Sequence, residues 1–117
     1  MLFKSDELKQ VVMEKPRGGP GRMESRCAIQ RGGSPEGSAF QLLAVMTLPP
    51  GSGMGYHQHA EDEEMYVILS GRGIFSDNGQ EKEVGPGDMA LTLKGESHGI
   101  TNVGGDPLVF LAAIVKK

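Results

Sequence analysis

The sequence predicts a small all-β domain, a sandwich or barrel, from three observations. Glycine makes up 18 of the 117 residues, roughly twice its usual share of about 7%, and so many glycines indicate frequent tight turns. From residue 56 onward, short strand-like runs recur at regular intervals, separated by glycine, proline and asparagine. A chain of 117 residues can build one hydrophobic core and leaves no room for a second domain.

The N-terminal part of the chain is less regular. Residues 1–15 carry scattered apolar side chains that suit either a short helical turn or a docked strand, and the pattern does not choose. Residues 16–21, rich in glycine and proline, predict a loop. We expect the segment 1–23 to dock on a barrel domain spanning 24–117, whose first strand is predicted over 24–31.

The remaining strands follow in order. After a second predicted loop at residues 31–38, the apolar run 39–48 has the length of a strand covered on both faces, although its pattern alone does not distinguish a strand from a helix. Seven shorter candidates follow: 56–59, 64–69, 72–76, 81–84, 89–93, 98–102 and 108–115. Asn78-Gly79, between two of them, is the strongest hairpin signal in the chain.

Composition excludes several classes of function. The net charge is −3 and no basic stripe is present, which gives nucleic-acid binding little support. No apolar run has the length of a membrane span, and the charged N-terminus is unlike a signal peptide. The single cysteine, Cys27, rules out an internal disulfide and a thiolate-rich zinc site, and it fits a reducing compartment. We therefore expect a soluble cytoplasmic protein that binds neither nucleic acid nor membrane.

Three histidines and one glutamate are the candidates for chemistry. His57 and His59 stand two residues apart on a predicted strand, so their imidazoles point to the same face. Glu64 opens the next strand after an acidic turn, and a strand that turns back here brings its carboxylate beside them. His98 is the third and last histidine of the chain, and one shared site would account for all three.

Strand alternation divides the residues around Glu64 between two faces. Glu64, Tyr66 and Ile68 share one face, so Glu63 must point the other way. The acidic residues that precede Glu64 are interpreted as a solvated run: Glu61, Asp62 and Glu63.

Two spaced motifs resemble those of a known family. Gly51-(five residues)-His57-Gln-His59-(four residues)-Glu64-(six residues)-Gly71 resembles the first cupin motif. Gly87-(five residues)-Leu93-Lys-Gly95-Glu-Ser-His98-(three residues)-Asn102 resembles the second, except that the family usually has proline where Leu93 stands. The 15 residues between the motifs are typical of small single-domain cupins, similar to the oxalate-binding and oxalate-decarboxylase-like members.

This resemblance implies a jelly-roll barrel (a double-stranded β-helix) that holds one divalent transition metal. The implied ligands are His57, His59, Glu64 and His98. Imidazole and carboxylate ligands suit Mn, Fe, Co, Ni or Zn, and the sequence does not say which. A divalent ion with one carboxylate leaves a charge near +1, which favours an anionic small-molecule ligand such as a carboxylate or enolate, with oxalate a reasonable example.

The rest of the site is predicted only in outline. Five side chains are candidates to line the pocket, with core packing as the alternative for each: Phe40, Met46, Met54, Tyr66 and Phe110. Three arginines are candidates to pair with an anion, with surface solvation as the alternative: Arg22, Arg26 and Arg31. No residue is assigned a catalytic role.

Two functions stay open at this point. One is an enzyme that oxidises, decarboxylates or isomerises a small anionic metabolite, and the other is a module that binds such a metabolite without turnover. The resemblance also implies a homodimer. Its contact is expected either on the face of Met65, Val67 and Leu69 or through an exchanged N-terminal segment.

Overall fold

The computed structural model describes residues 1–117, and its regular structure is almost entirely β. The ten strands are β1 (Lys9–Glu14), β2 (Arg22–Ile29), β3 (Phe40–Leu48), β4 (Gly53–Gln58), β5 (Asp62–Ser70), β6 (Gly73–Asp77), β7 (Gln80–Val84), β8 (Met89–Thr92), β9 (Ser97–Thr101) and β10 (Leu108–Lys116). Two single-turn 3-10 helices, η1 (Ser5–Glu7) and η2 (Pro16–Gly18), complete the chain, and neither has the length or the apolar character of a membrane-spanning helix.

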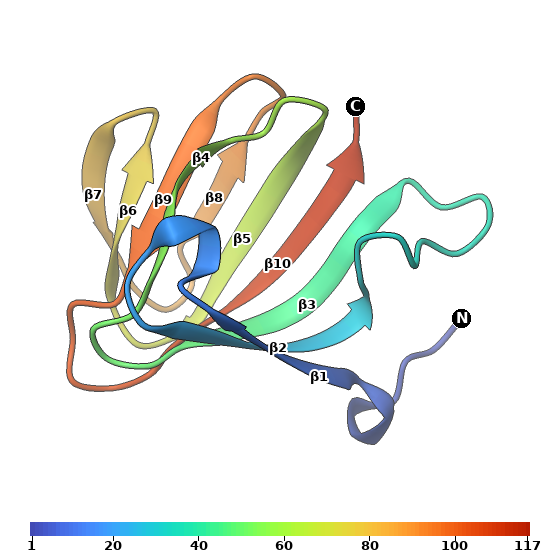
Figure 1. Cartoon of the computed structure of the whole chain (residues 1–117), viewed down its shortest axis with the longest axis horizontal. Coiled ribbons are helices and arrows are strands. Elements are labelled where there is room, and N and C mark those ends of the chain that lie inside the picture. Colours follow the sequence, from blue (N-terminus) through green and yellow to red (C-terminus); the bar gives the residue numbers. More distant parts are fainter.

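The strands form two antiparallel sheets that face each other around the core (Figure 1). One sheet has the order β1-β2-β3-β10-β5-β8, and the other has the order β4-β9-β6-β7. The chain crosses between the sheets after β3, β4, β5, β7, β8 and β9, which makes the fold a jelly-roll barrel. The all-β single-domain prediction is therefore confirmed.

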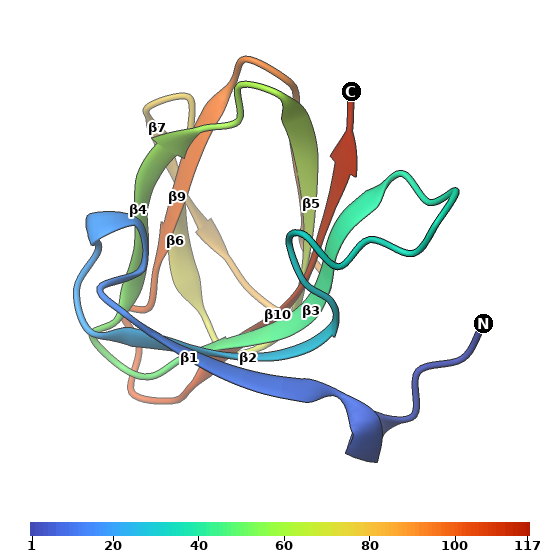
Figure 2. The same cartoon turned by 45° about the vertical axis from the view of Figure 1, so that its right-hand side comes forward.

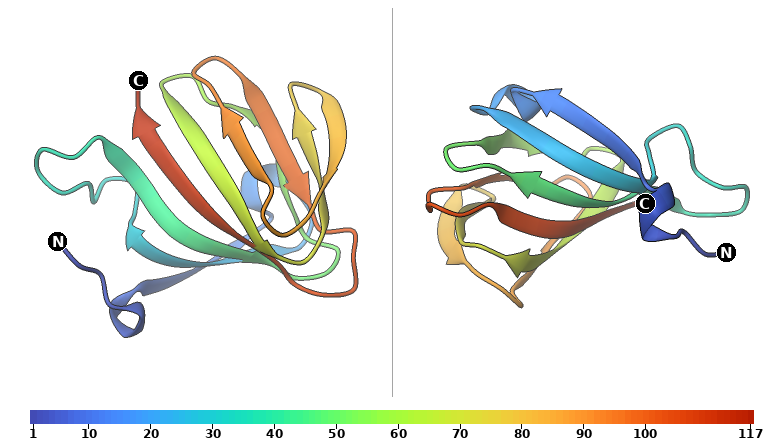
Figure 3. Two further views of the ribbon diagram at one scale, coloured as in Figure 1. Left: turned by 180° about the vertical axis from the view of Figure 1, so that it is seen from behind. Right: turned by 90° about the horizontal axis from the view of Figure 1, so that it is seen from below.

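The predicted strands correspond to observed ones from residue 22 onward, with ends that agree within three residues. For residues 1–15 the structure contains both elements that the sequence left open. The turn η1 comes first, and β1 then pairs with β2 along its whole length, from Lys9 opposite Cys27 to Glu14 opposite Arg22. β1 thereby becomes the edge strand of the six-stranded sheet (Figure 3).

The hairpin predicted at Asn78-Gly79 joins β6 to β7. Asp77 pairs with Gln80 across it, and both turn residues have positive φ, 51° at Asn78 and 90° at Gly79. Two consecutive left-handed residues define the turn that best matches the twist of paired strands.

The interior of the barrel changes character along β5. Ile68 and Tyr66 point into the apolar core, where Phe110 of β10 lies against the Tyr66 ring. Further along the same face, Glu64 and Asp62 are also buried. Every second residue of β5 thus faces the interior, and these residues are apolar at one end of the strand and acidic at the other.

Candidate metal centre

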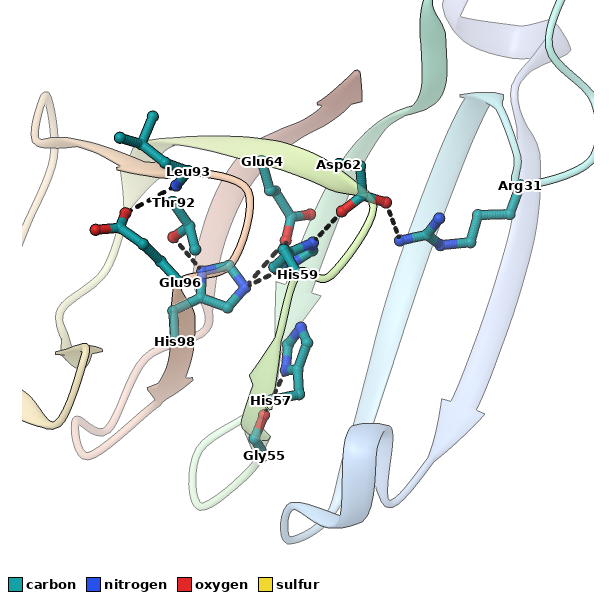
Figure 4. Close-up of polar contacts among 10 residues, drawn as sticks. All are labelled: Arg31, Gly55, His57, His59, Asp62, Glu64, Thr92, Leu93, Glu96 and His98. Atoms are coloured by element: carbon teal, nitrogen blue, oxygen red, sulfur yellow. Dashed lines mark hydrogen bonds and ion pairs between the residues drawn. The ribbon is translucent and has the colours of Figure 1, made fainter. Parts of the chain in front are cut away.

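The structure brings together the four side chains that the sequence selected. His57 lies on β4 and is the cross-strand partner of His98 on β9. His59 follows the end of β4, and Glu64 reaches the cluster from β5 in the opposite sheet (Figure 4). Their ligand atoms all lie within 4.8 Å of one another, with His57 half-buried and the other three buried.

Three of these side chains are in direct contact. Nε2 of His59 lies 3.0 Å from Nε2 of His98. The same two nitrogens lie 3.0 Å and 3.1 Å from Oε1 of Glu64. Two imidazole nitrogens and a carboxylate oxygen therefore converge on one point, and the His57 ring lies 5.0 Å and 4.8 Å from the other two rings, measured between centroids.

The opposite nitrogen of each imidazole has its own partner. Nδ1 of His59 donates to Oδ1 of Asp62 at 2.6 Å, and Nδ1 of His57 donates to the Gly55 carbonyl at 2.7 Å. Nδ1 of His98 lies 2.7 Å from Oγ1 of Thr92. A carbonyl or carboxylate oxygen only accepts, so these contacts assign the proton of His57 and His59 to Nδ1. With Nδ1 protonated, Nε2 is the nitrogen that these two rings can offer to a metal ion, and on His59 it lies against Oε1 of Glu64.

The interpretation of Asp62 as part of a solvated run is wrong. Its residue is only 8% exposed, and its carboxylate accepts from His59 and from Nη2 of Arg31 at 3.1 Å. β5 starts two residues earlier than predicted, so Asp62 shares the inward face of Glu64. The two-residue spacing from Glu64 was the available signal. Glu61 is exposed, as expected, whereas Glu63 faces outward but is half-buried.

The pKa values of the cluster follow from burial and from these hydrogen bonds. Burial lowers the pKa of His57 below its ordinary value. Burial also acts to lower the pKa of His59, but hydrogen bonds to Glu64 and Asp62 outweigh it and raise that pKa. Burial acts to raise the pKa of Glu64, whereas its bonds to His59 and His98 outweigh that effect and lower it. Glu64 is therefore an anion at neutral pH, ready to act as a ligand.

A cavity of about 390 Å³ opens onto this cluster, and His57, His59 and Glu64 form part of its wall. Two of the predicted pocket residues, Met46 and Met54, line it.

The other three predicted pocket residues lie elsewhere. The Tyr66 ring stacks on His98 with centroids 5.0 Å apart, and Phe110 packs behind it, so both support the site from the core. Phe40 does not line the cavity. It lies at the exposed first position of β3, beside the projecting 31–38 loop (Figure 1), and is 41% exposed.

Of the three candidate arginines, only Arg31 reaches the site. Its side chain extends toward Asp62 (Figure 4) and lines the cavity. Arg22 and Arg26 are exposed and bond elsewhere. A cation that the sequence did not single out, Arg17 in the η2 turn, also lines the cavity.

Comparison with known proteins agrees with this geometry. The family model of the cupin domain matches residues 44–114. The chain belongs to the cupin family. An oxalate-binding protein of Thermotoga maritima is 38% identical to this cupin over 115 residues, which cover 98% of this chain and 93% of the relative. The family resemblance seen in the two motifs is thus confirmed.

Solved structures give the same result for the fold of this cupin. The crystal structure of a predicted oxalate decarboxylase from Thermotoga maritima matches with a TM-score of 0.90 at 38% identity, covering 100% of both chains. The structure of KdgF from Halomonas matches with a TM-score of 0.74 at 15% identity, covering 100% of this chain and 94% of KdgF, and shows the fold alone.

Proposed function

We propose that this cupin binds one divalent transition metal through His57, His59, Glu64 and His98, and that the metal holds a small chelating anion such as oxalate. The observation that carries the proposal is the convergence of three imidazoles and one carboxylate from both sheets within 4.8 Å. A bound ion would act as a Lewis acid toward oxygen ligands. Mn, Fe, Co, Ni and Zn all suit this ligand set.

The distances within the cluster support a metal with open positions. Two ligand atoms that each lie about 2.1 Å from an ion are about 3.0 Å apart when they subtend a right angle, but about 3.4 Å apart in a tetrahedral site. The three contacts among His59, His98 and Glu64 are 3.0, 3.0 and 3.1 Å. With His57 as the fourth ligand, an octahedral ion held here would keep two positions free, which is the number that a chelating dicarboxylate fills.

The positive charge at the site and the similarity to a known relative support an anionic ligand. The metal with Glu64 carries a net positive charge, and Arg17 and Arg31 add cations to the cavity wall. A relative that is 38% identical over nearly the whole chain is an oxalate-binding protein.

The cavity wall favours binding over decarboxylation. Glu64 is the only acidic residue that lines the cavity, and it is already committed to His59 and His98. No free carboxylic acid is therefore placed to exchange protons with a ligand. We propose a binding role first and a metal-dependent reaction as the alternative, which an assay of oxalate consumption in air would distinguish.

The test is metal content followed by anion binding. Protein purified without chelator is analysed by mass spectrometry for metals, then loaded with Co(II) and titrated with oxalate while the visible spectrum is recorded. We expect one ion per chain and a spectral change that saturates. Glu64→Gln should lose most of the metal, whereas Glu63→Gln, its outward-facing neighbour, should keep it. Retention of metal by Glu64→Gln, or a Co(II) spectrum unmoved by oxalate, would contradict the proposal.

A further inference from the structure

The cavity is larger than the small anion proposed above. Its volume is about 390 Å³. At about 30 Å³ for each water-sized group the cavity has room for roughly 13 such groups, so the six non-hydrogen atoms of oxalate would fill at most about half of it. The value instead falls in the range of sites for larger organic ligands, about 300–1,000 Å³. A ligand that filled the whole cavity would need a larger organic part in addition to its metal-binding group.

The apolar part of the cavity wall is rich in methionine. Four of the seven methionines of the chain line it: Met13, Met23, Met46 and Met54. Val11, Leu42 and Ile114 add branched aliphatic side chains. The candidate metal ligands in the wall come from β4, the residue after it and β5: His57, His59 and Glu64.

Met54 shares β4 with His57 and Ile114 is the cross-strand partner of Glu64, but the rest of the apolar wall comes from strands without a candidate ligand. Val11 and Met13 belong to β1, and Met23 belongs to β2. Neither strand carries a candidate ligand, and Figure 4 shows both as pale blue ribbons set apart from the three imidazoles. Methionine is unbranched and flexible, so it adapts its shape to an apolar ligand. The cavity is thus amphipathic, with a metal-binding end and an apolar end.

We infer that the natural ligand is a carboxylate with a second oxygen on the neighbouring carbon and an apolar side chain of several carbons. This inference rests on the proposed function, because the two oxygens of the head occupy the open metal positions. The side chain then lies against the methionine wall, and Arg17 and Arg31 face the charged head from the rim. Oxalate is bound through the same head but leaves the apolar end unused.

The test is a chain-length series on the metal-loaded protein. Oxalate, pyruvate, 2-oxobutanoate, 2-oxohexanoate and 2-oxooctanoate are compared by calorimetry, the last four sharing one chelating head. Affinity should rise by roughly three- to fourfold for each added methylene. An affinity that stays level or falls from pyruvate to 2-oxooctanoate would overturn the inference.

Two variants fill the apolar end without touching a ligand residue. Ser25 on β2 and Val11 opposite it on β1 both line the cavity. Ser25→Leu and Val11→Phe should remove most of the gain with chain length, whereas oxalate affinity should stay within about twofold. Val11 lies on the edge strand, so Val11→Phe serves if Ser25→Leu fails to fold.

The outcomes separate the two proposals. A protein that binds oxalate and pyruvate but gains nothing from longer chains refutes only the apolar ligand. The apolar ligand is also refuted if Ser25→Leu and Val11→Phe bind 2-oxooctanoate as tightly as the parent chain does. A protein that holds no metal and binds neither oxalate nor pyruvate refutes the proposed function together with this inference.

Discussion

At the scale of single residues, Asp62 links the metal cluster to the cavity rim. It accepts the Nδ1 proton of His59, which leaves Nε2 as the metal-facing nitrogen. Its other carboxylate oxygen holds Arg31, which would otherwise be free to swing into solvent. One buried carboxylate therefore orients an imidazole and places a cation.

We expect Asp62→Asn to weaken metal binding by about 10- to 100-fold, the usual effect of losing such a supporting partner. The amide keeps the shape of the side chain but not the charge that favours the Nδ1–H tautomer. Competition with a coloured chelator measures the affinity. Glu63→Gln removes a charge from the adjacent outward-facing position and is the control. Equal affinities for the two variants would show that Asp62 does not support the site.

At the scale of elements, the η2 turn is packed closely on β4 (Figure 2). Gly19, directly after the turn, and Gly55 of β4 make this approach possible. A Cβ on Gly55 would overlap the Arg17 carbonyl oxygen, and one on Gly19 would overlap that of Gly53. Arg17 itself has a left-handed backbone, with φ of 51°. This contact places the Arg17 side chain at the cavity.

We expect Gly55→Ala to push the turn away and to lower the free energy of unfolding by about 1–3 kcal/mol, as other overpacked sites do. Anion affinity should fall with the displacement of Arg17. Urea unfolding and oxalate titration measure the two effects. Gly105→Ala is the matched control, since a Cβ there meets no atom within 4 Å. The packing argument fails if both alanine variants are equally stable.

At the scale of the whole molecule, the outer face of the six-stranded sheet is apolar across four strands. The pairing register aligns Val45 of β3, Leu111 of β10, Val67 of β5 and Met89 of β8 in one row. Leu91 lies two positions along β8, and it and Met89 are 56% and 77% exposed. Val45, Leu111 and Val67 are half-buried, and an apolar face that exposes large side chains at one edge is typical of an interface.

The homodimer stays a prediction, and this face is where we expect its contact. Light scattering should give twice the chain mass of 12.5 kDa. The double variant Met89→Glu/Leu91→Glu should give the mass of one chain, because charges on the face oppose its burial. Val103→Glu, an exposed loop position, should remain dimeric. A monomeric parent protein would rule out the dimer, and a double variant that stays dimeric would move the contact to the exchanged N-terminal segment.

Local sequence was sufficient for the fold class and the core of the site. The period of two in strands, broken by glycine turns, identifies the strands from β2 onward within three residues and assigns their side chains to faces. That is why His57, His59 and Glu64 could be selected together from a short stretch.

Only the tertiary structure decided what surrounds the four side chains. Arg31 donates to Asp62, which lies 31 residues further along the chain. Residues 9–14 form a strand because they pair with β2. Unbroken alternation along β3 would turn Phe40 inward, but a register shift pairs it with Val115, whose other partner is the outward-facing Glu63. Cavity volume depends on side chains from five or more strands at once. Such properties arise from how sheets face each other, and no periodicity within a single segment encodes them.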